Sequence, residues 1–277
     1  MNKISIGIVL YQNSEQEVWS CLDSIASQEG SVVVQEVLIR DQGGTLEDCV
    51  SRWMREHQTP FEIVFSAGKN IGFGSGHNIL FESISSESIA YLCLNPDARL
   101  HPLCIQNLYQ FAQSHSWNGL FEPQHEPVML PKYYDPVSGI TEWCSGACIL
   151  IPASIYRELK GFDEQFFMYC EDVDFSWRAR VLGFNCYVCV SARAFHFVGD
   201  RSGRMQMAAT SQFILACKWG DLYDQLPVKE RLIELKVKEL HDLDLMSEAI
   251  MKIESDLISK VRPNFSNGDI YAKALWT

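Results

Sequence analysis

The chain has 277 residues, of which 47% are hydrophobic, 12% aromatic and 21% charged. This composition is typical of a globular protein and excludes a disordered tail, a collagen-like fibre and a coiled-coil rod. The 35 acidic residues outnumber the 23 basic ones, which gives a net charge of −12 at pH 7. We therefore expect no nucleic-acid partner, because binding to many phosphates requires a basic surface, whereas a local basic pocket for one diphosphate remains compatible with this charge.

The apolar runs of the sequence are short. The first, residues 4–11, is shorter than the core of a secretory signal and is not followed by a small-residue cleavage site. No run reaches 18 apolar residues, so we expect no membrane-spanning helix. The 10 cysteines then predict reduced thiols in a cytoplasmic protein. Cys186 and Cys189 are three apart in a strand-like run and should face opposite sides of a sheet, which indicates buried structural cysteines rather than a zinc site.

The first hundred residues alternate apolar, β-branched runs with helical patterns. Residues 4–10 form a near-continuous apolar run, as expected of a parallel strand that is covered on both faces. Behind a Ser14 cap, residues 14–27 repeat apolar side chains at helical spacing. Further strands are expected at 32–39, 61–65 and 89–94, and further helices at 46–56 and 76–83. This alternation predicts an α/β sheet with right-handed crossovers, in which ligands bind at the carboxyl ends of the strands.

The second half of the chain is less regular. Residues 117–136 have a proline-rich, aromatic loop pattern, and regular patterns resume at 143–152, 166–182 and 184–190. Residues 228–261 favour helix throughout, with an apolar stripe that should pack against the main domain or a second copy of the chain. Nearly balanced charges disfavour a membrane surface for this helix. We therefore expect a domain of residues 1–226 and a C-terminal helical extension of residues 227–277.

A glycine-rich segment follows the third expected strand. Residues 68–78 read Gly-Lys-Asn-Ile-Gly-Phe-Gly-Ser-Gly-His-Asn. Closely spaced glycines allow a backbone to approach a ligand, and the helix behind them offers amides that favour an anion. The spacing differs from a Walker loop, and the position after the third strand disfavours a dinucleotide fingerprint. A ligand-binding loop and an ordinary tight turn both remain open at this point.

Acidic residues mark two further places. Asp97, in Asn-Pro-Asp after an apolar strand, is at the sheet edge where a divalent cation could bridge it to a diphosphate, although this triplet is also ordinary turn chemistry. Glu171, Asp172 and Asp174 open a probable helix, where like charges raise one another's pKa, as suits a general base. Arg178 lies four residues after Asp174 and should pair with it. Asp174 is therefore the expected structural acid, and Asp172 or Glu171 the chemical one.

His196 follows the last strand-like run and precedes a Gly-Asp-Arg-Ser loop that contains Arg201. A single histidine is usually a structural residue. In a chain that already offers a carboxylate for a metal, His196 is a candidate second ligand. Arg201 would then supply positive charge to a leaving diphosphate.

In chain order, these segments resemble family 2 of the inverting glycosyltransferases, which have the GT-A fold, a Rossmann-like mixed and mostly parallel sheet flanked by helices. The bacterial rhamnosyltransferase branch is the nearest resemblance, and it covers about residues 3–205. The matching segments are Tyr11-Gln12-Asn13, Asp41, residues 70–78, Asn95-Pro96-Asp97, residues 143–147, residues 161–174 and His196.

The resemblance implies a nucleotide-diphosphate-sugar donor held across the first half of the sheet, with Mg²⁺ or Mn²⁺ as cofactor. Asp97 takes the metal-binding position of the family's D-x-D motif, in which Asn95 replaces the first acid, and His196 matches a later metal ligand. The loss of that acid puts strict metal dependence in doubt. The implied donor-binding residues are Tyr11, Asp41, Asn70, Gly72, Gly76, Asn78, Asn95, Asp97 and Arg201.

The same resemblance implies the chemistry. Asp172 matches the base of the family's Glu-Asp motif, beside Glu171, and would take the proton of an acceptor hydroxyl during a single displacement with inversion. Trp143 is similar to the aromatic platform beneath an acceptor sugar. The rhamnosyltransferase branch favours dTDP-L-rhamnose as donor, with UDP-galactose or UDP-galactofuranose as alternatives. A glycan or lipid-linked acceptor in surface polysaccharide synthesis would bring a cytoplasmic enzyme to the inner membrane face.

Two other classes of protein remain open. One is a catalytically inactive nucleotide-sugar-binding scaffold that assembles, for example as a homodimer, through the C-terminal helix. The intact Asp172 and His196 disfavour it. The other is a nucleotidyltransferase, which usually carries a basic glycine-rich loop after its first strand, where this chain has Tyr-Gln-Asn-Ser at residues 11–14.

Overall fold

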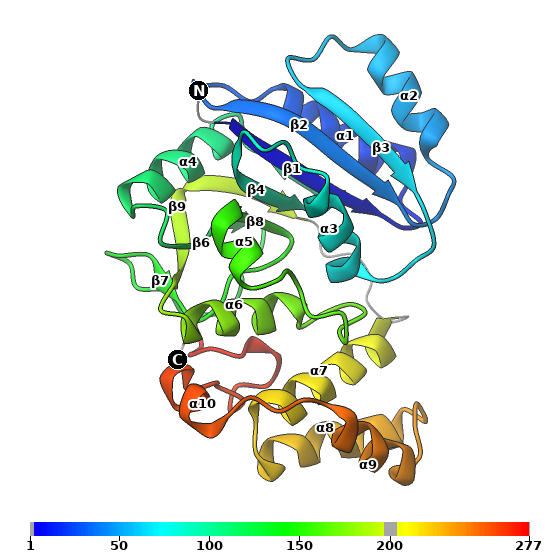
Figure 1. Cartoon of the computed structure of the whole chain (residues 1–277), viewed down its shortest axis with the longest axis vertical. Helices are drawn as coiled ribbons and strands as arrows, with labels where there is room; N and C mark the ends of the chain where they lie inside the picture. The colour runs from blue at the N-terminus through cyan, green and yellow to red at the C-terminus, as the bar shows by residue number, and fades with distance from the viewer. Residues whose placement is uncertain (1–2, 197–203, 277) are drawn as a thin grey trace.

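The computed structural model describes residues 3–196 and 204–276, and its centre is one mixed, mostly parallel β-sheet (Figure 1). The strands are β1 (Lys3–Leu10), β2 (Val33–Asp41), β3 (Glu62–Ala67), β4 (Ser88–Leu94), β5 (Ala98–Leu100), β6 (Gly119–Glu126), β7 (Ile140–Thr141), β8 (Cys148–Pro152) and β9 (Asn185–His196). They lie in the order β3-β2-β1-β4-β8-β6-β9-β5, and β7 pairs with β9. The pairs from β3 to β4 are parallel, and β8 is antiparallel to β4 and β6. The predicted α/β class is confirmed.

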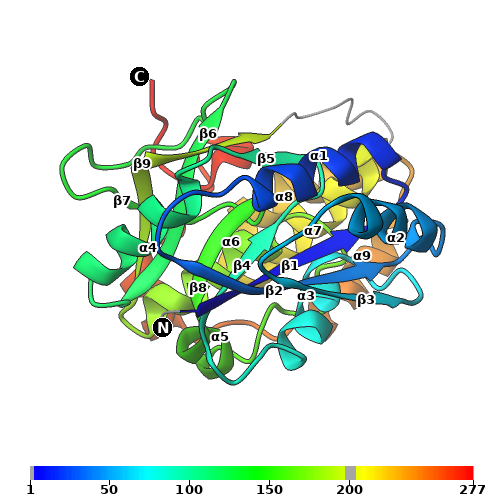
Figure 2. The same cartoon turned by 90° about the horizontal axis from the view of Figure 1, so that it is seen from above.

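Helices cover both faces of the sheet (Figures 1 and 2). They are α1 (Glu15–Ala26), α2 (Glu47–Glu56), α3 (Phe73–Glu82), α4 (Cys104–Ser114), α5 (Ala153–Glu158), α6 (Glu171–Val181), α7 (Met205–Trp219), α8 (Leu222–Glu234), α9 (Leu240–Ala249) and α10 (Ser255–Val261), with a 3₁₀ turn, η2, at Gly268–Ile270. Ile4, Ile6 and Ile8 of β1 pack with α1, α2 and α4, whereas Val9 packs with α3, α5 and α6. Because alternate residues of a strand point to opposite faces, β1 contributes to the core on both sides of the sheet.

The strand–helix alternation expected in the first hundred residues is confirmed, with one shifted boundary. α3 begins at Phe73, three residues before the expected start at 76, because the glycines Gly74 and Gly76 are accommodated inside its first turns. The residue before the helix, Gly72, has a φ of 94°, in the left-handed region that favours glycine. The glycine-rich segment is therefore partly loop and partly helix.

β6 occupies part of the segment in which the sequence predicted only loops, so that prediction was wrong. β6 is an interior strand, parallel to β9 on one side and antiparallel to β8 on the other. It contains Pro123 and the buried polar side chains Glu122 and His125, which hide the alternation of an ordinary strand. The prediction for Cys186 and Cys189 is confirmed, since both are buried, free thiols in the cores on opposite faces of the sheet.

Residues 228–261 form α8, α9 and α10 rather than one continuous helix. Lys236, just beyond α8, has a φ of 53°, which ends that helix. Ile253 lies between α9 and α10, and its N–H donates to the carbonyl of Lys218 on α7 at 3.0 Å. One hydrophobic core joins these helices to α6 and α7, and it includes Trp177, Phe213 and Leu243. The expected division between residues 226 and 227 falls inside α8. No helix in the described part of the chain is long and apolar enough to cross a bilayer.

The last described residues return to the main sheet and pair with a segment between β6 and β7. The N–H of Tyr133 donates to the carbonyl of Lys273 at 2.7 Å, and the N–H of Leu275 donates to the carbonyl of Pro131 at 2.8 Å. Lys132 and Ala274 lie opposite each other in this antiparallel bridge. The C-terminal segment thus fixes the backbone on which Lys132 is carried.

Candidate active site

The carboxyl ends of β1 and β2 present the first two predicted donor-binding residues. Tyr11 follows β1 and its side chain is 42% exposed. Asp41 ends β2 and is buried. Its carboxylate accepts hydrogen bonds from the backbone N–H groups of Gly43, Thr45 and Leu46, each at 2.8 Å. Asp41 therefore shapes the loop that leads into α2, and its predicted contact with a base stays a prediction.

Gln42, which the sequence analysis did not single out, holds the glycine loop in place. Its side-chain amide donates to the carbonyl of Gly72 at 3.0 Å and accepts from the N–H of Ile71 at 3.0 Å. Asn70 accepts from the N–H of Gly72 at 3.1 Å. The loop is thus tied to the end of β2, and the only signal in the sequence was the position of Gln42 directly after Asp41.

The remaining two predicted residues of the glycine loop have internal partners. A Cβ on Gly76 would lie 3.0 Å from a methyl group of Val9, so a larger residue would press against β1. The Asn78 amide accepts from the Tyr156 hydroxyl at 2.8 Å, and it both accepts from and donates to the backbone of Phe162 at 2.9 Å. Asn78 joins α3 to the segment before α6, and its role toward a donor remains a prediction.

Asn95, Asp97 and His196 lie together at the carboxyl end of β4. Asp97 Oδ1 lies 3.4 Å from His196 Nε2, and Asn95 Nδ2 lies 3.3 Å from the same nitrogen. The pairing of Ala98 on β5 with His196 on β9 creates this contact between residues far apart in sequence. Asp97 Oδ1 is a buried atom that accepts no hydrogen bond from the residues described. The carboxylate oxygen is the type of ligand that suits Mg²⁺ or Mn²⁺, and the imidazole nitrogen is a ligand for divalent transition metals.

This pair is smaller than a complete metal centre. Among residues 3–196 and 204–276, no group of three or more His, Cys, Asp or Glu side chains is arranged to hold a metal ion. A cation bound between Asp97 and His196 would need further ligands from a bound substrate or from water. Arg201, the predicted clamp for the diphosphate, lies outside the described residues.

Asp172 lies in the first turn of α6, where a helix N-terminus favours a negative charge. Its Oδ2 accepts from the N–H of Gly146 at 2.9 Å, and its Oδ1 accepts from the N–H of Val173 at 2.9 Å. Burial raises the pKa of Asp172, while these backbone hydrogen bonds act in the opposite direction. Burial, together with the charge of Asp172, raises the pKa of Glu171 well above the usual range. The two acids thus lie in different environments, Glu171 buried and Asp172 partly exposed, and the predicted role of Asp172 as base stays a prediction.

One short segment connects the acid to the end of β4. Gly146 donates to Asp172, and the carbonyl of the next residue, Ala147, accepts from the N–H of Asn95 at 2.9 Å. A Cβ on Gly146 would lie 3.1 Å from the ring of Phe73 and 3.4 Å from Cβ of Asp172. The start of α3, the start of α6 and the Asn95–Asp97 turn therefore meet around residues 146–147.

Asp174 has the structural role that the sequence predicted. Its Oδ2 accepts from Arg178 Nε at 2.7 Å, and its Oδ1 accepts from Trp219 Nε1 at 2.8 Å and lies 2.7 Å from Lys218 Nζ. Burial opposes the charge of this carboxylate, but Arg178 and Lys218 outweigh it and lower the pKa of Asp174. The side chain therefore joins α6 to α7 as an ion.

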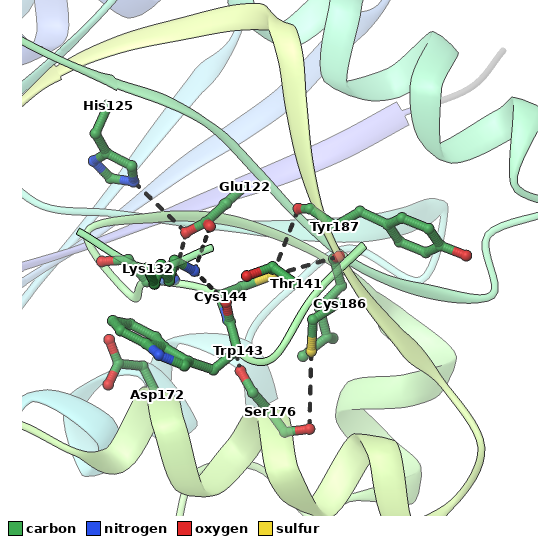
Figure 3. Close-up of polar contacts among 12 residues, drawn as sticks. Glu122, His125, Lys132, Thr141, Trp143, Cys144, Asp172, Ser176, Cys186 and Tyr187 are labelled. Atoms are coloured by element: carbon green, nitrogen blue, oxygen red, sulfur yellow. Dashed lines mark hydrogen bonds and ion pairs between the residues drawn. The ribbon is translucent and has the colours of Figure 1, made fainter. Parts of the chain in front are cut away.

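Trp143 is held near Asp172 by its own set of contacts (Figure 3). Its indole N–H donates to the carbonyl of Ile270 at 2.7 Å. The ammonium of Lys132 lies 4.1 Å from the centre of the Trp143 ring and also donates to the Trp143 carbonyl. One face of the ring is thus covered by a cation, and the predicted acceptor contact would have to use the rest of the indole.

Lys132 and Glu122 form a buried ion pair that no sequence pattern indicated. Lys132 Nζ lies 2.5 Å from Glu122 Oε1, and the two side chains are 2% and 1% exposed. Glu122 also accepts from the N–H of Ser145 at 2.7 Å, and burial raises its pKa. The pair comes from β6 and from the segment that the C-terminal residues hold, so only the tertiary structure brings it beside Trp143 (Figure 3).

Comparisons with known proteins agree with this architecture, although no protein-family model matches the chain. The low-salt glycan biosynthesis hexosyltransferase Agl10 of Haloferax volcanii is 24% identical over 221 residues, which cover 71% of this chain and 67% of that protein. An N-acetylglucosaminyl-diphospho-decaprenol L-rhamnosyltransferase of Mycobacterium tuberculosis is 39% identical over 62 residues, which cover 22% of this chain and 20% of that protein.

Among solved structures, the mannosyltransferase PcManGT from Pyrobaculum calidifontis in complex with GDP-Man and Mn²⁺ superposes with a TM-score of 0.62. The sequence identity is 14%, and the match covers 94% of this chain and 72% of that one. The likeness shows the GT-A fold predicted from the sequence. Together with the relatives, it identifies the chain as a glycosyltransferase.

Proposed function

We propose that the chain is an inverting glycosyltransferase of family 2, which moves a sugar from a nucleotide-diphosphate sugar to a hydroxyl of a glycan or lipid-linked saccharide. The observation that carries this proposal is the short link from Asp172 through Gly146 and Ala147 to Asn95. It sets a partly buried acid next to the strand end where the fold binds ligands.

The proposed reaction is a single displacement. The acceptor oxygen forms a bond to the anomeric carbon on the face opposite the leaving group. The bond from that carbon to the phosphate oxygen breaks, and its electron pair leaves with the nucleoside diphosphate. Asp172 takes the proton of the acceptor hydroxyl, and the Gly146 and Val173 N–H groups orient its carboxylate for this task.

Tyr11, Asp41, the loop of Asn70, Gly72, Gly76 and Asn78, and the Asn95–Asp97 turn would bind the donor, with Trp143 beside the acceptor. Asp97 and His196 would hold Mg²⁺ or Mn²⁺, and such a cation would supply positive charge to the departing diphosphate.

The proposed donor is dTDP-L-rhamnose, with UDP-galactose or UDP-galactofuranose as alternatives. Support for rhamnose comes from the short match to the mycobacterial L-rhamnosyltransferase. The name of that relative, with its decaprenol-linked acceptor, also supports a lipid-linked acceptor. We infer from such an acceptor a place in surface polysaccharide synthesis and a cytoplasmic protein that works at the inner membrane face. The alternative function is a scaffold that binds nucleotide sugars without turnover, as a homodimer through its C-terminal helices.

The test is release of nucleoside diphosphate from a panel of nucleotide sugars, in wild type and in Asp172→Asn. Loss of a positioned base typically lowers the rate about 10²- to 10⁴-fold. We expect a loss of that size in Asp172→Asn, with donor affinity in calorimetry nearly unchanged. The substitution preserves size, removes the charge and gives up one of the two backbone hydrogen bonds to the carboxylate, but it leaves the proposed donor-binding residues in place. The control is Glu164→Gln, an exposed acid shortly before α6, which should behave as wild type.

Three outcomes would each contradict one part of this proposal. Full turnover in Asp172→Asn would remove it from the role of base. A wild-type protein that binds a nucleotide sugar but never releases the diphosphate would be the scaffold. Equal rates in excess EDTA and in Mn²⁺ would show that the chain needs no cation, as the replacement of an acid by Asn95 allows.

A further inference from the structure

Lys132 is a buried lysine whose ammonium is placed between an acid and an aromatic ring. It lies 2.5 Å from Glu122 Oε1 and 4.1 Å from the centre of the Trp143 ring, and it donates to the Trp143 carbonyl. Its side chain is 2% exposed. A charge in such a place persists only with close partners, because burial of an unpaired ammonium is costly.

Stability alone does not account for this arrangement. The desolvation of two buried ions largely offsets their attraction, and a well-packed apolar pair of similar volume is often as stable. The field of a buried cation, however, acts strongly on nearby groups because little water screens it. We therefore ask which neighbouring ionisable groups the charge of Lys132 stabilises or destabilises.

Asp172 is one of these groups, and it lies in an otherwise acidic setting. The ionisable groups that act on one another around it are Glu171 and Cys170 beside it in the chain, Glu122 on β6 and Lys132. Burial raises the pKa of Asp172, and among the opposing influences is the charge of Lys132. Lys132 is thus the cation among the otherwise acidic groups that act on the proposed base.

Lys132 also reaches Asp172 through the backbone. It holds the Trp143 carbonyl, and three residues further along the chain the Gly146 N–H donates to the Asp172 carboxylate. Glu122 holds the same segment through the Ser145 N–H. Figure 3 shows Lys132, Trp143 and Asp172 gathered at one side of the group.

We propose that Lys132 is a positioning residue for the transfer reaction: held by Glu122, it fixes the segment of Trp143 and Gly146 against Asp172 and stabilises the ionised form of that base. The inference rests on the proposed role of Asp172 and adds the device that keeps the carboxylate ready to accept a proton.

The experiment is the pH profile of kcat/KM for wild type and Lys132→Met in the full chain. A base must be ionised to act, so activity falls as pH drops through its pKa. This fall of kcat/KM at low pH is the acidic limb of the profile, and without Lys132 it should move to higher pH. The rate below the limb should then fall about tenfold for each pH unit of movement, and much of the loss should be recovered at high pH.

Two variants separate this effect from a structural one. Lys218→Met removes another buried lysine, which pairs with Asp163 and Asp174 behind α6, and it should lower Tm without moving the limb. If Lys132→Met does not fold, the double variant Lys132→Met/Glu122→Gln avoids an unpaired buried carboxylate. Its acidic limb should move in the same direction but by a smaller amount, because Glu122 is itself an acid that acts on Asp172. A rate lowered equally at every pH in these variants would overturn the proposal.

A second readout does not depend on turnover. Carboxyl-carbon NMR of labelled aspartate can follow the titration of Asp172, assigned by comparison with Asp172→Asn. We expect the Asp172 signal to titrate at higher pH in Lys132→Met than in wild type. If no nucleotide sugar is turned over, the proposed function fails by itself, and an unmoved NMR titration would independently overturn the role of Lys132.

Discussion

Asp172 and Asp174 show how two like residues on one helix acquire different tasks from their neighbours. Asp174 is fully buried among Arg178, Lys218 and the Trp219 indole, which keep it charged and use it as a structural link. Asp172 meets backbone N–H groups instead of a close cation, and these hydrogen bonds do not outweigh burial, which raises its pKa. The Arg178 spacing predicted the first role from the sequence, whereas the partners of Asp172 come from residues distant in the chain.

His77 provides a prediction about stability at the scale of one residue. It is fully buried, Nδ1 lies 2.9 Å from the Tyr91 hydroxyl, and burial lowers its pKa to about 3. In the unfolded chain a histidine titrates near 6.5, so below that pH the unfolded state binds a proton that the folded state does not. The free energy of unfolding should therefore fall as pH drops from about 6.5, by about 2 kcal/mol at pH 5.

Urea unfolding at pH 7 and pH 5 measures this contribution. In His77→Gln, which keeps a polar side chain without titrating, the loss between the two pH values should be smaller than in wild type by about that amount. His125, which is buried and also has its pKa lowered to about 3, keeps part of the pH dependence in both proteins. The exposed His241→Gln should resemble wild type, and an equal slope in His77→Gln would contradict the assignment.

At the scale of elements, the junction between the glycine loop and α3 depends on Gly72. Its φ is 94°, and a Cβ there would lie 2.2 Å from the carbonyl oxygen of Phe167. That same oxygen accepts from the N–H of Phe73 at 2.9 Å. The loop, the first turn of α3 and the segment before α6 are thus fitted to one another at a position without a side chain.

We expect Gly72→Ala to lower stability by more than about 1 kcal/mol, because alanine is strained at positive φ and its methyl group would displace Phe167. The displaced loop should also weaken binding of the donor. The matched control is Gly44→Ala, since Gly44 has a φ of 71° but nothing within 4 Å of its Cβ position. Thermal unfolding and calorimetry with the nucleotide sugar measure both effects, and equal losses in the two variants would show that only backbone strain matters.

The elements also show what the sequence could predict. The first hundred residues follow local rules, in which apolar runs become buried strands and helical spacing becomes helices, and these were predicted well. β6 was missed because Glu122 and His125 are polar side chains whose burial depends on Lys132 and on β9. The Asp97–His196 contact was expected from the family resemblance. Gln42 was marked only by its position directly after Asp41, and Lys132 by no local pattern.

At the scale of the whole molecule, the C-terminal residues are part of the candidate site rather than an appendage. The core that contains Trp177 also contains Leu243 and Tyr271. Beyond that core, Ile270 holds the Trp143 indole, and residues 273–275 pair with residues 131–133. The position of Lys132 therefore depends on contacts made at the far end of the chain.

A proline pair tests this dependence. Leu275→Pro removes the N–H that donates to the Pro131 carbonyl. Ala274→Pro places the same ring one residue earlier, at a position with no described backbone hydrogen bond from its N–H. We expect a several-fold lower kcat in Leu275→Pro than in Ala274→Pro. Donor binding should be alike in both, because the proposed donor-binding residues lie at the ends of β1 to β4 and not at this bridge. Equal kcat values would show that the bridge does not influence the site.

The pairing of residues 131–133 with residues 273–275 has a consequence for biosynthesis. A ribosome makes the sheet first, so the strand ends that would hold the nucleotide are complete while the last helices are still being translated. The segment that carries Lys132 pairs with residues 273–275, which are translated much later. A nascent chain halted before residue 273 would carry the acid of α6 without the backbone bridge that fixes the Lys132 segment. Premature termination should therefore yield a protein that binds the nucleotide but transfers the sugar poorly.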